Sequence, residues 1–118
     1  PFHCTASGKV FLASTPLPLR RIMVESLQLE KYTARTLRKR SELMEELEQI
    51  ENQGFALDQG EFIDGMVAIA VPIRSIEGQY MASLALHGPS QRLSIESVVS
   101  KKGSLLKAAE KINKVWLT

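Results

Sequence analysis

The chain has 118 residues and a formal net charge of +2, with 44% hydrophobic and 24% charged residues. This length suits one domain with a single core, and the composition is ordinary for a globular protein. No apolar run is long enough to cross a bilayer and the one cysteine excludes an internal disulfide, so we expect a cytoplasmic protein without a membrane partner. Because the first residue is Pro1 rather than methionine, we also expect a piece of a longer protein.

Charge is distributed unevenly along the chain. Residues 1–40 carry eight Lys/Arg and two Glu, residues 41–87 one Arg and nine Asp/Glu, and residues 88–118 six Lys/Arg and two Glu. The basic ends could attract nucleic acid or an anionic ligand, whereas the acidic middle argues against one continuous basic face. Five of the cations surround Tyr32 in residues 31–40, as in a phosphate-contacting arm, although a charged loop or edge strand fits the same pattern.

The first predicted helix lies within residues 1–14, where Thr5 or Ser7 can cap its start. A helix N-terminus leaves backbone N–H groups without partners, and these can bind a carboxylate or a phosphate. Here the donors would be the N–H groups of Thr5, Ala6, Ser7 and Gly8. A capped helix with no ligand explains the same residues.

Two more helices are predicted before the first strand. Residues 19–29 read as an amphipathic helix whose inward residues would be Leu19, Ile22, Met23 and Leu27. Residues 41–53 form the clearest helix in the chain, with Ser41 as its N-cap and Gly54 at its C-terminal stop.

A β-hairpin is predicted over residues 66–88, because apolar residues alternate on either side of a turn at Glu77 and Gly78. The alternation places Tyr80 on the same face as Leu84. That face carries bulky residues suited to a core, and the other carries the smaller set Ala68, Ala70, Ser83, Ala85 and His87. Small residues leave room for a ligand pocket, or for a helix that packs closely against the sheet.

The segments on either side of the hairpin complete the chain. Residues 55–61 read as a short strand in which Asp58 interrupts an apolar start. Its carboxylate should be hydrogen-bonded or functional, unless it faces water at a strand edge. After the hairpin, Ser94 would cap a final helix that runs to the end of the chain, with Gly103 as a weak point inside it.

No arrangement of residues indicates catalysis. His3 and Cys4 are sequence neighbours, so their side chains point in different directions in a helix or strand, and the chain shows no metal-ligand spacing. Glu61 and Asp64 could be drawn as an acid/base pair, but nothing in the sequence forces either into an apolar environment. We therefore expect no enzyme, no metal site and no cofactor.

Several short motifs follow one another along the whole chain. They are HxTAxGK at residues 3–9, G-[FY]-A at 54–56, A-x-P at 70–72 and L-x-x-x-GP-x-x-R-[LI] at 84–93, with Asp58, Glu61 and Gly65 between them. Their succession resembles the ligand-sensing domain of IclR-type bacterial transcription regulators. Members of that family join an N-terminal winged helix-turn-helix, which binds DNA, to a C-terminal effector-binding domain of GAF-like α/β architecture.

This resemblance implies the fold and the domain content of the chain. The expected fold is α+β, a GAF-like antiparallel sheet flanked by helices. Residues 1–118 would form one effector-binding domain that lacks its first strands, and the winged helix-turn-helix would be absent from the chain.

The resemblance also implies where an effector would bind. Family ligands, commonly small carboxylic or aromatic acids, lie between the start of the first helix and the sheet. The matching residues and their polar neighbours are Ala6, Ser7, Gly8, Asp58, Ala68, Ser83, Ala85 and His87. The strand that often reads S-x-S-G in the family is A-L-H-G at residues 85–88, which removes one hydroxyl at Ala85 and substitutes an imidazole at His87. We expect the effector carboxylate on the helix amides, and His87 with Ser83 or Asp58 on a second polar group.

Three functions are therefore compared. The first is an effector-binding domain that senses a small organic acid, forms a homo-dimer or tetramer, and meets DNA only through the missing N-terminal module. The second is a structural or dimerisation module whose small-residue face is filled by side chains. The third is direct DNA binding through residues 31–40, which would weaken steeply with salt. The first two differ in whether a cavity opens beside Ala6, Asp58, Ala68, Ala85 and His87.

Overall fold

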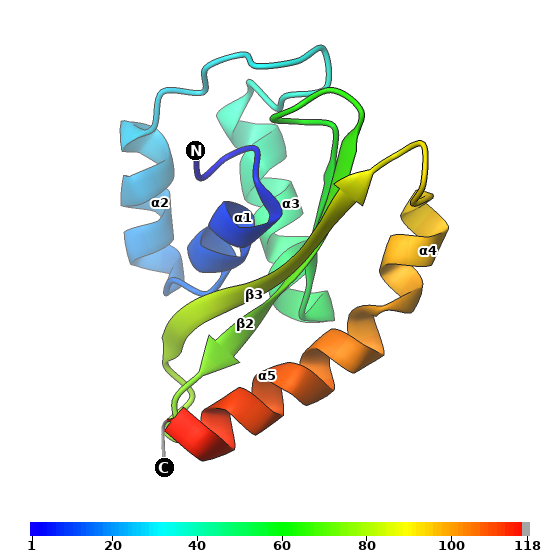
Figure 1. Ribbon diagram of the computed structural model, residues 1–118. Coiled ribbons are helices and arrows are strands. Elements are labelled where there is room, and N and C mark those ends of the chain that lie inside the picture. Colours follow the sequence, from blue (N-terminus) through cyan, green and yellow to red (C-terminus); the bar gives the residue numbers. More distant parts are fainter. Residues whose placement is uncertain (117–118) are drawn as a thin grey trace.

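The computed structural model consists of a three-stranded antiparallel sheet with helices on both faces (Figure 1). It describes the backbone of residues 1–116 and the side chains of residues 1–115. The strands β1 (Ala56–Gln59), β2 (Met66–Arg74) and β3 (Tyr80–Pro89) lie in the order β1-β2-β3. One face carries α1 (Ala6–Ala13), α2 (Leu17–Ser26) and α3 (Arg40–Gln53), and the other carries α4 (Ile95–Ser100) and α5 (Lys102–Trp116). The predicted α+β fold is confirmed at this level. Within the described residues, no helix combines the length and apolarity that crossing a membrane requires.

The predicted hairpin is present and its register assigns the faces of the sheet. Ala68 pairs with His87, Ala70 with Ala85 and Pro72 with Ser83, so the small residues do share one face. A register shift between Ile73 and Arg74 pairs Arg74 with Tyr80 and leaves Met81 without a partner. This bulge turns Tyr80 onto the face of Ser83, so the prediction that it shares a face with Leu84 is wrong.

Two hydrophobic cores hold the helices on the sheet. On the small-residue face, α1 and α3 pack their apolar residues against Ala56, Ala68 and Ala70. On the bulky face, Ile69 and Val71 pack against Val98 of α4 and the α5 residues around Ala109. A helix therefore lies close against the small residues, which was one of the two outcomes considered for that face.

The predicted inward face of α2 is correct for Met23 and Leu27, which pack against the core, and wrong for Leu19 and Ile22. Ile22 is 67% exposed and Leu19 is also exposed, whereas Arg20 and Val24 are buried. The Arg20 guanidinium donates hydrogen bonds to the carbonyl oxygens of Leu12 and Ala13, at the C-terminal end of α1, and of Thr15 just after it, and pairs with Glu51 of α3. The last carbonyl groups of a helix lack the usual N–H partner four residues on, so the need for a donor explains why Arg20 faces inward.

Other helix boundaries differ from the sequence predictions in detail. α3 begins at Arg40 and its N-cap is Lys39, without a side-chain cap, rather than Ser41. Gly54 ends it as predicted, with a φ of 86°. Ser94 also caps as predicted, but Lys101 divides the last helix into α4 and α5 just before the expected weak point.

Residues 31–39 form a loop rather than a strand, and hydrogen bonds hold this loop against the residues that follow β1. The Thr33 and Thr36 hydroxyls donate to the carbonyl oxygens of Gly60 and Glu61 at 2.6 Å each. Of the five cations in residues 31–40, Arg35 and Arg40 donate to backbone carbonyl groups of the protein itself. These contacts leave fewer cations for a phosphate-contacting arm.

Candidate functional site

Two open N–H groups mark the start of α1. Thr5 is the N-cap, and its Oγ1 accepts a hydrogen bond from the Gly8 N–H at 3.0 Å. The Lys9 N–H donates to the Thr5 carbonyl oxygen at 3.0 Å. In the part of the chain that the structure describes, no acceptor lies on the N–H groups of Ala6 and Ser7. Of the four donors predicted from the sequence, Gly8 therefore has its acceptor within the protein, and the positive end of the helix dipole lies behind the N–H groups of Ala6 and Ser7.

Gly8 allows the beginning of the chain to fold over this helix start. A Cβ atom on Gly8 would lie 2.6 Å from Phe2 Cα and 2.7 Å from Thr5 Oγ1. Both distances are shorter than atoms tolerate, so a side chain here would push the cap and the chain start apart.

A row of three residues crosses the sheet on the same face as α1. Asp58 of β1 pairs with Ala68 of β2, and Ala68 pairs with His87 of β3. Asp58 is 6% exposed, and its Oδ1 accepts a hydrogen bond from the Glu61 N–H at 2.8 Å, so the carboxylate does not face water. Burial raises the pKa of the Asp58 carboxyl, although the Glu61 N–H and the Lys9 ammonium act in the opposite direction. His87 at the other end of the row is exposed.

The raised pKa of Asp58 predicts how the stability of the domain depends on pH. The folded state holds the Asp58 proton more tightly than the unfolded state, whose pKa is near the ordinary 3.8. This preference stabilises the folded state below pH 3.8, and the stabilisation is lost as the pH rises through the raised pKa of Asp58 in the folded state. Asp58→Asn keeps an oxygen for the Glu61 N–H, so it should match the wild type in acid and exceed it at neutral pH. Urea unfolding across this range measures the difference, and a gap that does not change with pH would contradict the prediction.

Lys9 joins four parts of the fold beside this row, and sequence reasoning missed it. Its side chain is 1% exposed, and Nζ donates to Glu46 Oε2 at 2.6 Å, to the Leu57 carbonyl oxygen at 2.6 Å and to Glu61 Oε1 at 2.8 Å. Burial alone would lower the pKa of the Lys9 ammonium, but the Glu61 and Glu46 carboxylates outweigh it and raise that pKa. The available signal was a single lysine within the otherwise apolar GKVFLA segment.

An open hollow of ≈ 490 Å³ lies along the flank of α1 and contains three of the predicted site residues. Ser83 Oγ donates to the Ser7 carbonyl oxygen at 3.1 Å and lies 2.8 Å from the Tyr80 hydroxyl. Three rings complete the lining, with Phe11 centred 5.1 Å from Phe2 and 5.4 Å from Tyr80. The residues around the hollow are Pro1, Phe2, Thr5, Ser7, Gly8, Phe11, Tyr80, Ala82 and Ser83. Sequence reasoning missed the rings, since the bulge decides where Tyr80 points.

The eight predicted residues thus fall into three groups. Ser7, Gly8 and Ser83 line the hollow, and Asp58 and His87 lie at the two ends of the cross-strand row. The remaining three are packing residues between them: Ala6 and Ala68 are buried in the α1 core, and Ala85 is half-buried against it.

Neither candidate for catalysis forms a reactive pair. The His3 ring lies 2.9 Å from the Glu30 carbonyl oxygen through Nε2, and burial raises the pKa of the Cys4 thiol to about 11. Glu61 is paired with Lys9, while Asp64 is exposed. The Glu61 carboxylate therefore serves the buried ion pair.

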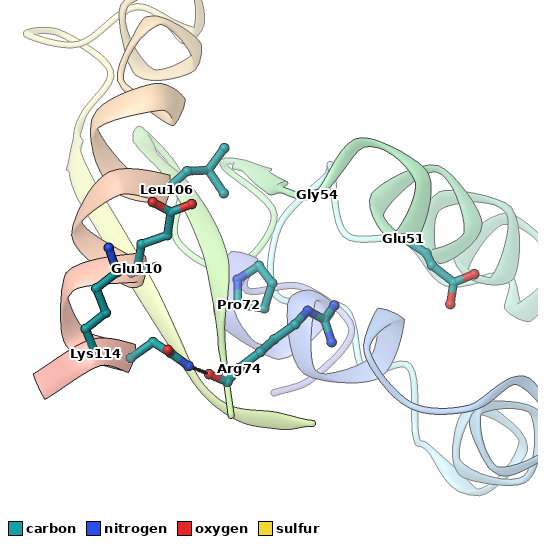
Figure 2. Close-up of a pocket in the computed structure, with 9 residues that line it drawn as sticks. Glu51, Gly54, Pro72, Arg74, Leu106, Glu110 and Lys114 are labelled. Carbon is teal, nitrogen blue, oxygen red and sulfur yellow. Dashed lines mark hydrogen bonds between the residues drawn. The ribbon is translucent and has the colours of Figure 1, made fainter. Parts of the chain in front are cut away.

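A larger hollow of ≈ 740 Å³ lies elsewhere, between α5, the end of β2 and the C-terminal end of α3 (Figure 2). Its polar lining has both signs of charge, from Glu110 and Lys114 of α5, Arg74 of β2 and Glu51 of α3. The Asn113 side chain closes part of it by donating a hydrogen bond to the Arg74 carbonyl oxygen. None of the predicted site residues lines this hollow.

Comparison with known proteins identifies the family. The family described as "Bacterial transcriptional regulator IclR C-terminal" matches residues 1–114. This chain belongs to the IclR family. It corresponds to the C-terminal, effector-binding domain of IclR regulators.

Individual relatives agree with this assignment. The probable transcriptional regulator SauR of Cupriavidus necator is 31% identical over 116 residues, which are 98% of this chain and 46% of SauR. BhcR of Paracoccus denitrificans is 35% identical over 112 residues, 94% of this chain and 40% of BhcR. The crystal structure of the C-terminal domain of Escherichia coli KdgR superposes with a TM-score of 0.88 at 32% identity, covering 97% of this chain and 70% of that one.

The chain spans less than half the length of SauR and BhcR. These relatives are transcriptional regulators and not enzymes, as the sequence predicted for this chain.

Proposed function

We propose that this IclR-type domain binds a small organic acid between the start of α1 and the small-residue face of the hairpin. The observation that carries the proposal is the pair of N–H groups without an acceptor in the described residues, on the buried Ala6 and the half-buried Ser7 at the positive end of α1. Two parallel donors at a helix N-terminus suit a carboxylate, and the small side chains there let an anion approach.

The second end of the ligand would meet the cross-strand row. Asp58 and His87 flank the Ala68 methyl group, so they can contact one polar group of a ligand that passes over Ala68. A hydroxyl or carbonyl oxygen suits this position, because the imidazole can donate to it and the carboxylate can accept from a hydroxyl. Ser83 offers another hydroxyl on the flank of α1.

In the longer protein, effector binding would act by population shift. An effector that binds one quaternary arrangement better than another biases the attached winged helix-turn-helix modules by that difference in affinity. We propose a homo-dimer or tetramer as the assembly that is shifted, with DNA bound only by the N-terminal modules.

A thermal-shift screen of the 118-residue chain tests ligand binding. Small carboxylic acids, aromatic acids and sugar acids are compared with their uncharged amide analogues. A ligand at 100 times its dissociation constant should add about 2.7 kcal/mol of stability, and each kcal/mol raises Tm by roughly 2–8 °C. We expect an acid to stabilise the domain while its amide does not. Equal shifts for acid and amide would contradict an anion site at Ala6 and Ser7.

The second candidate is a structural module whose small-residue face is already filled. The burial of Ala6 in α1 and of Ala68 on the sheet beneath this helix favours it. Silence across the acid panel, together with stable self-association of the chain, would support this function over ligand sensing.

Ala85→Leu separates the two candidates. The larger side chain would overfill the space between α1 and β3, at a cost of about 1–3 kcal/mol. Ligand binding should be lost, whereas a structural module loses only stability. Ala109→Leu is the matched control, because it overfills the core on the opposite face of the sheet. Normal binding by Ala85→Leu would show that the ligand lies elsewhere.

A further inference from the structure

Apolar packing brings α1 close to the sheet. The buried sheet residues in this core are the alanines at positions 56, 68 and 70, with Tyr80 and Ala85 partly buried beside them, and α1 presents Ala6, Val10, Leu12 and Ala13 to it. Apolar contact is not directional, so geometrically specific contacts to α1 have to come from polar groups.

Ser83 donates a hydrogen bond to the Ser7 carbonyl oxygen and Arg20 donates to carbonyl oxygens at the other end of α1, whereas the directional contacts of Lys9 start from the middle of the helix. An ammonium group has three protons, and here they go to Glu46 of α3, the Leu57 carbonyl oxygen of β1 and Glu61 after β1, all within 2.8 Å. Lys9 therefore fastens α1 to three other parts of the fold through a single atom. Buried charge-assisted hydrogen bonds are the strong and geometrically specific kind.

The same contacts connect the two ends of the candidate effector site. Lys9 follows Ser7 by two residues, in the helical turn that carries the open N–H groups. Glu61 bonds to Lys9 through its carboxylate and donates its own N–H to Asp58 Oδ1 at 2.8 Å. A chain of two polar contacts thus runs from α1 through Lys9 and Glu61 to Asp58.

We propose that Lys9 and Glu61 are positioning residues that fix the separation between the α1 N–H groups and Asp58, and so select effectors by length. This inference rests on the proposed function for its meaning, since only a ligand that spans both ends is selected. An acid whose carboxylate and second polar group match the separation binds, and one that is a methylene too long or too short does not. Preorganisation of this kind lowers the cost of binding.

The position of α1 can be measured without any ligand. The test variant is Lys9→Met combined with Glu61→Gln, because removing both charges avoids a buried ion without its partner. In the 118-residue chain with labelled alanine methyl groups, NMR detects proximity between α1 and the alanines of the sheet. We expect the double variant to change this pattern and to shift the amide signals of Ala6 and Ser7. Val98→Ala is the control, since it weakens the core on the other face of the sheet and should leave both readouts unchanged.

Ligand selection is measured with three probe acids. Glycolate, 3-hydroxypropanoate and 4-hydroxybutanoate hold a carboxylate and a hydroxyl apart by one more methylene at each step. We expect the wild type to favour one ligand length and the double variant to lose that preference. The affinity for the favoured acid should fall on the order of tenfold, which is the loss typical when residues that support a binding site, such as the outer shell of a metal site, are replaced. Val98→Ala should keep the ranking.

The outcomes separate the inference from the proposed function. An unchanged alanine pattern in the double variant overturns the positioning role, whatever the ligand does. A changed pattern with the same length preference also overturns it, because α1 would then move without affecting selection. If none of the acids binds the wild type, the proposed site fails for these probes, while the alanine pattern still decides whether Lys9 and Glu61 hold α1.

Discussion

Lys9→Met should lower the free energy of unfolding by about 3–5 kcal/mol, the cost of leaving one partner of a buried ion pair without the other. Glu61 is the partner left without a counter-charge, because its carboxylate is buried. Glu46 is half-exposed, so its carboxylate can turn to water. Methionine matches the four-carbon stem of the lysine side chain in length and removes the ammonium group. The loss therefore reports on the ammonium group, and urea unfolding at neutral pH measures it.

The second variant in this series identifies the source of the loss. Adding Glu61→Gln to Lys9→Met removes the unpaired charge, so stability should recover in large part. Lys107→Met is the matched control, because Lys107 is exposed on α5 and its replacement should change stability by no more than about 0.5 kcal/mol. A double variant as unstable as the single one would show that packing around residue 9, rather than the Glu61 charge, carries the cost.

Features encoded by neighbouring residues could be predicted from the sequence. The hairpin follows from alternation around a turn, where Gly78 adopts a φ of 84°. The Thr5 and Ser94 caps and the Gly54 stop are likewise decided within a few residues of the helix ends. Local chemistry was sufficient for these elements, and it also placed open donors at the start of α1.

Features decided by distant partners could not be predicted. The burial of Arg20 in α2 depends on carbonyl groups at and just after the C-terminal end of α1, and apolar periodicity does not indicate them. Burial of Lys9 depends on carboxylates 37 and 52 residues away. The same holds for the candidate site, where the row of Asp58, Ala68 and His87 requires the strand register. Small residues at a strand face fit both a pocket and a closely packed helix, so their identity alone could not separate the two.

Arg20 is the other buried cation whose replacement should have a large effect. Its Nε and Nη2 groups reach three backbone carbonyl oxygens, those of Leu12 and Ala13 at the C-terminal end of α1 and that of Thr15 in the following turn. A buried acceptor left without a donor costs about 1–3 kcal/mol. Arg20→Met should therefore lower the free energy of unfolding by about 3 kcal/mol or more, even though Glu51, its ion-pair partner, is half-exposed and can be hydrated.

Two further variants separate geometry from charge at this position. Arg20→Lys keeps the charge, but one ammonium group cannot reproduce the planar fork that serves all three carbonyls, so we expect it to recover only part of the loss. Arg21→Met is the control, since Arg21 is the exposed neighbour on the same helix. Urea unfolding compares the three, and an Arg20→Lys variant as stable as the wild type would mean that charge alone is needed. If geometry matters as expected, α2 is oriented by the carbonyl groups it covers, which explains why Ile22 points to solvent.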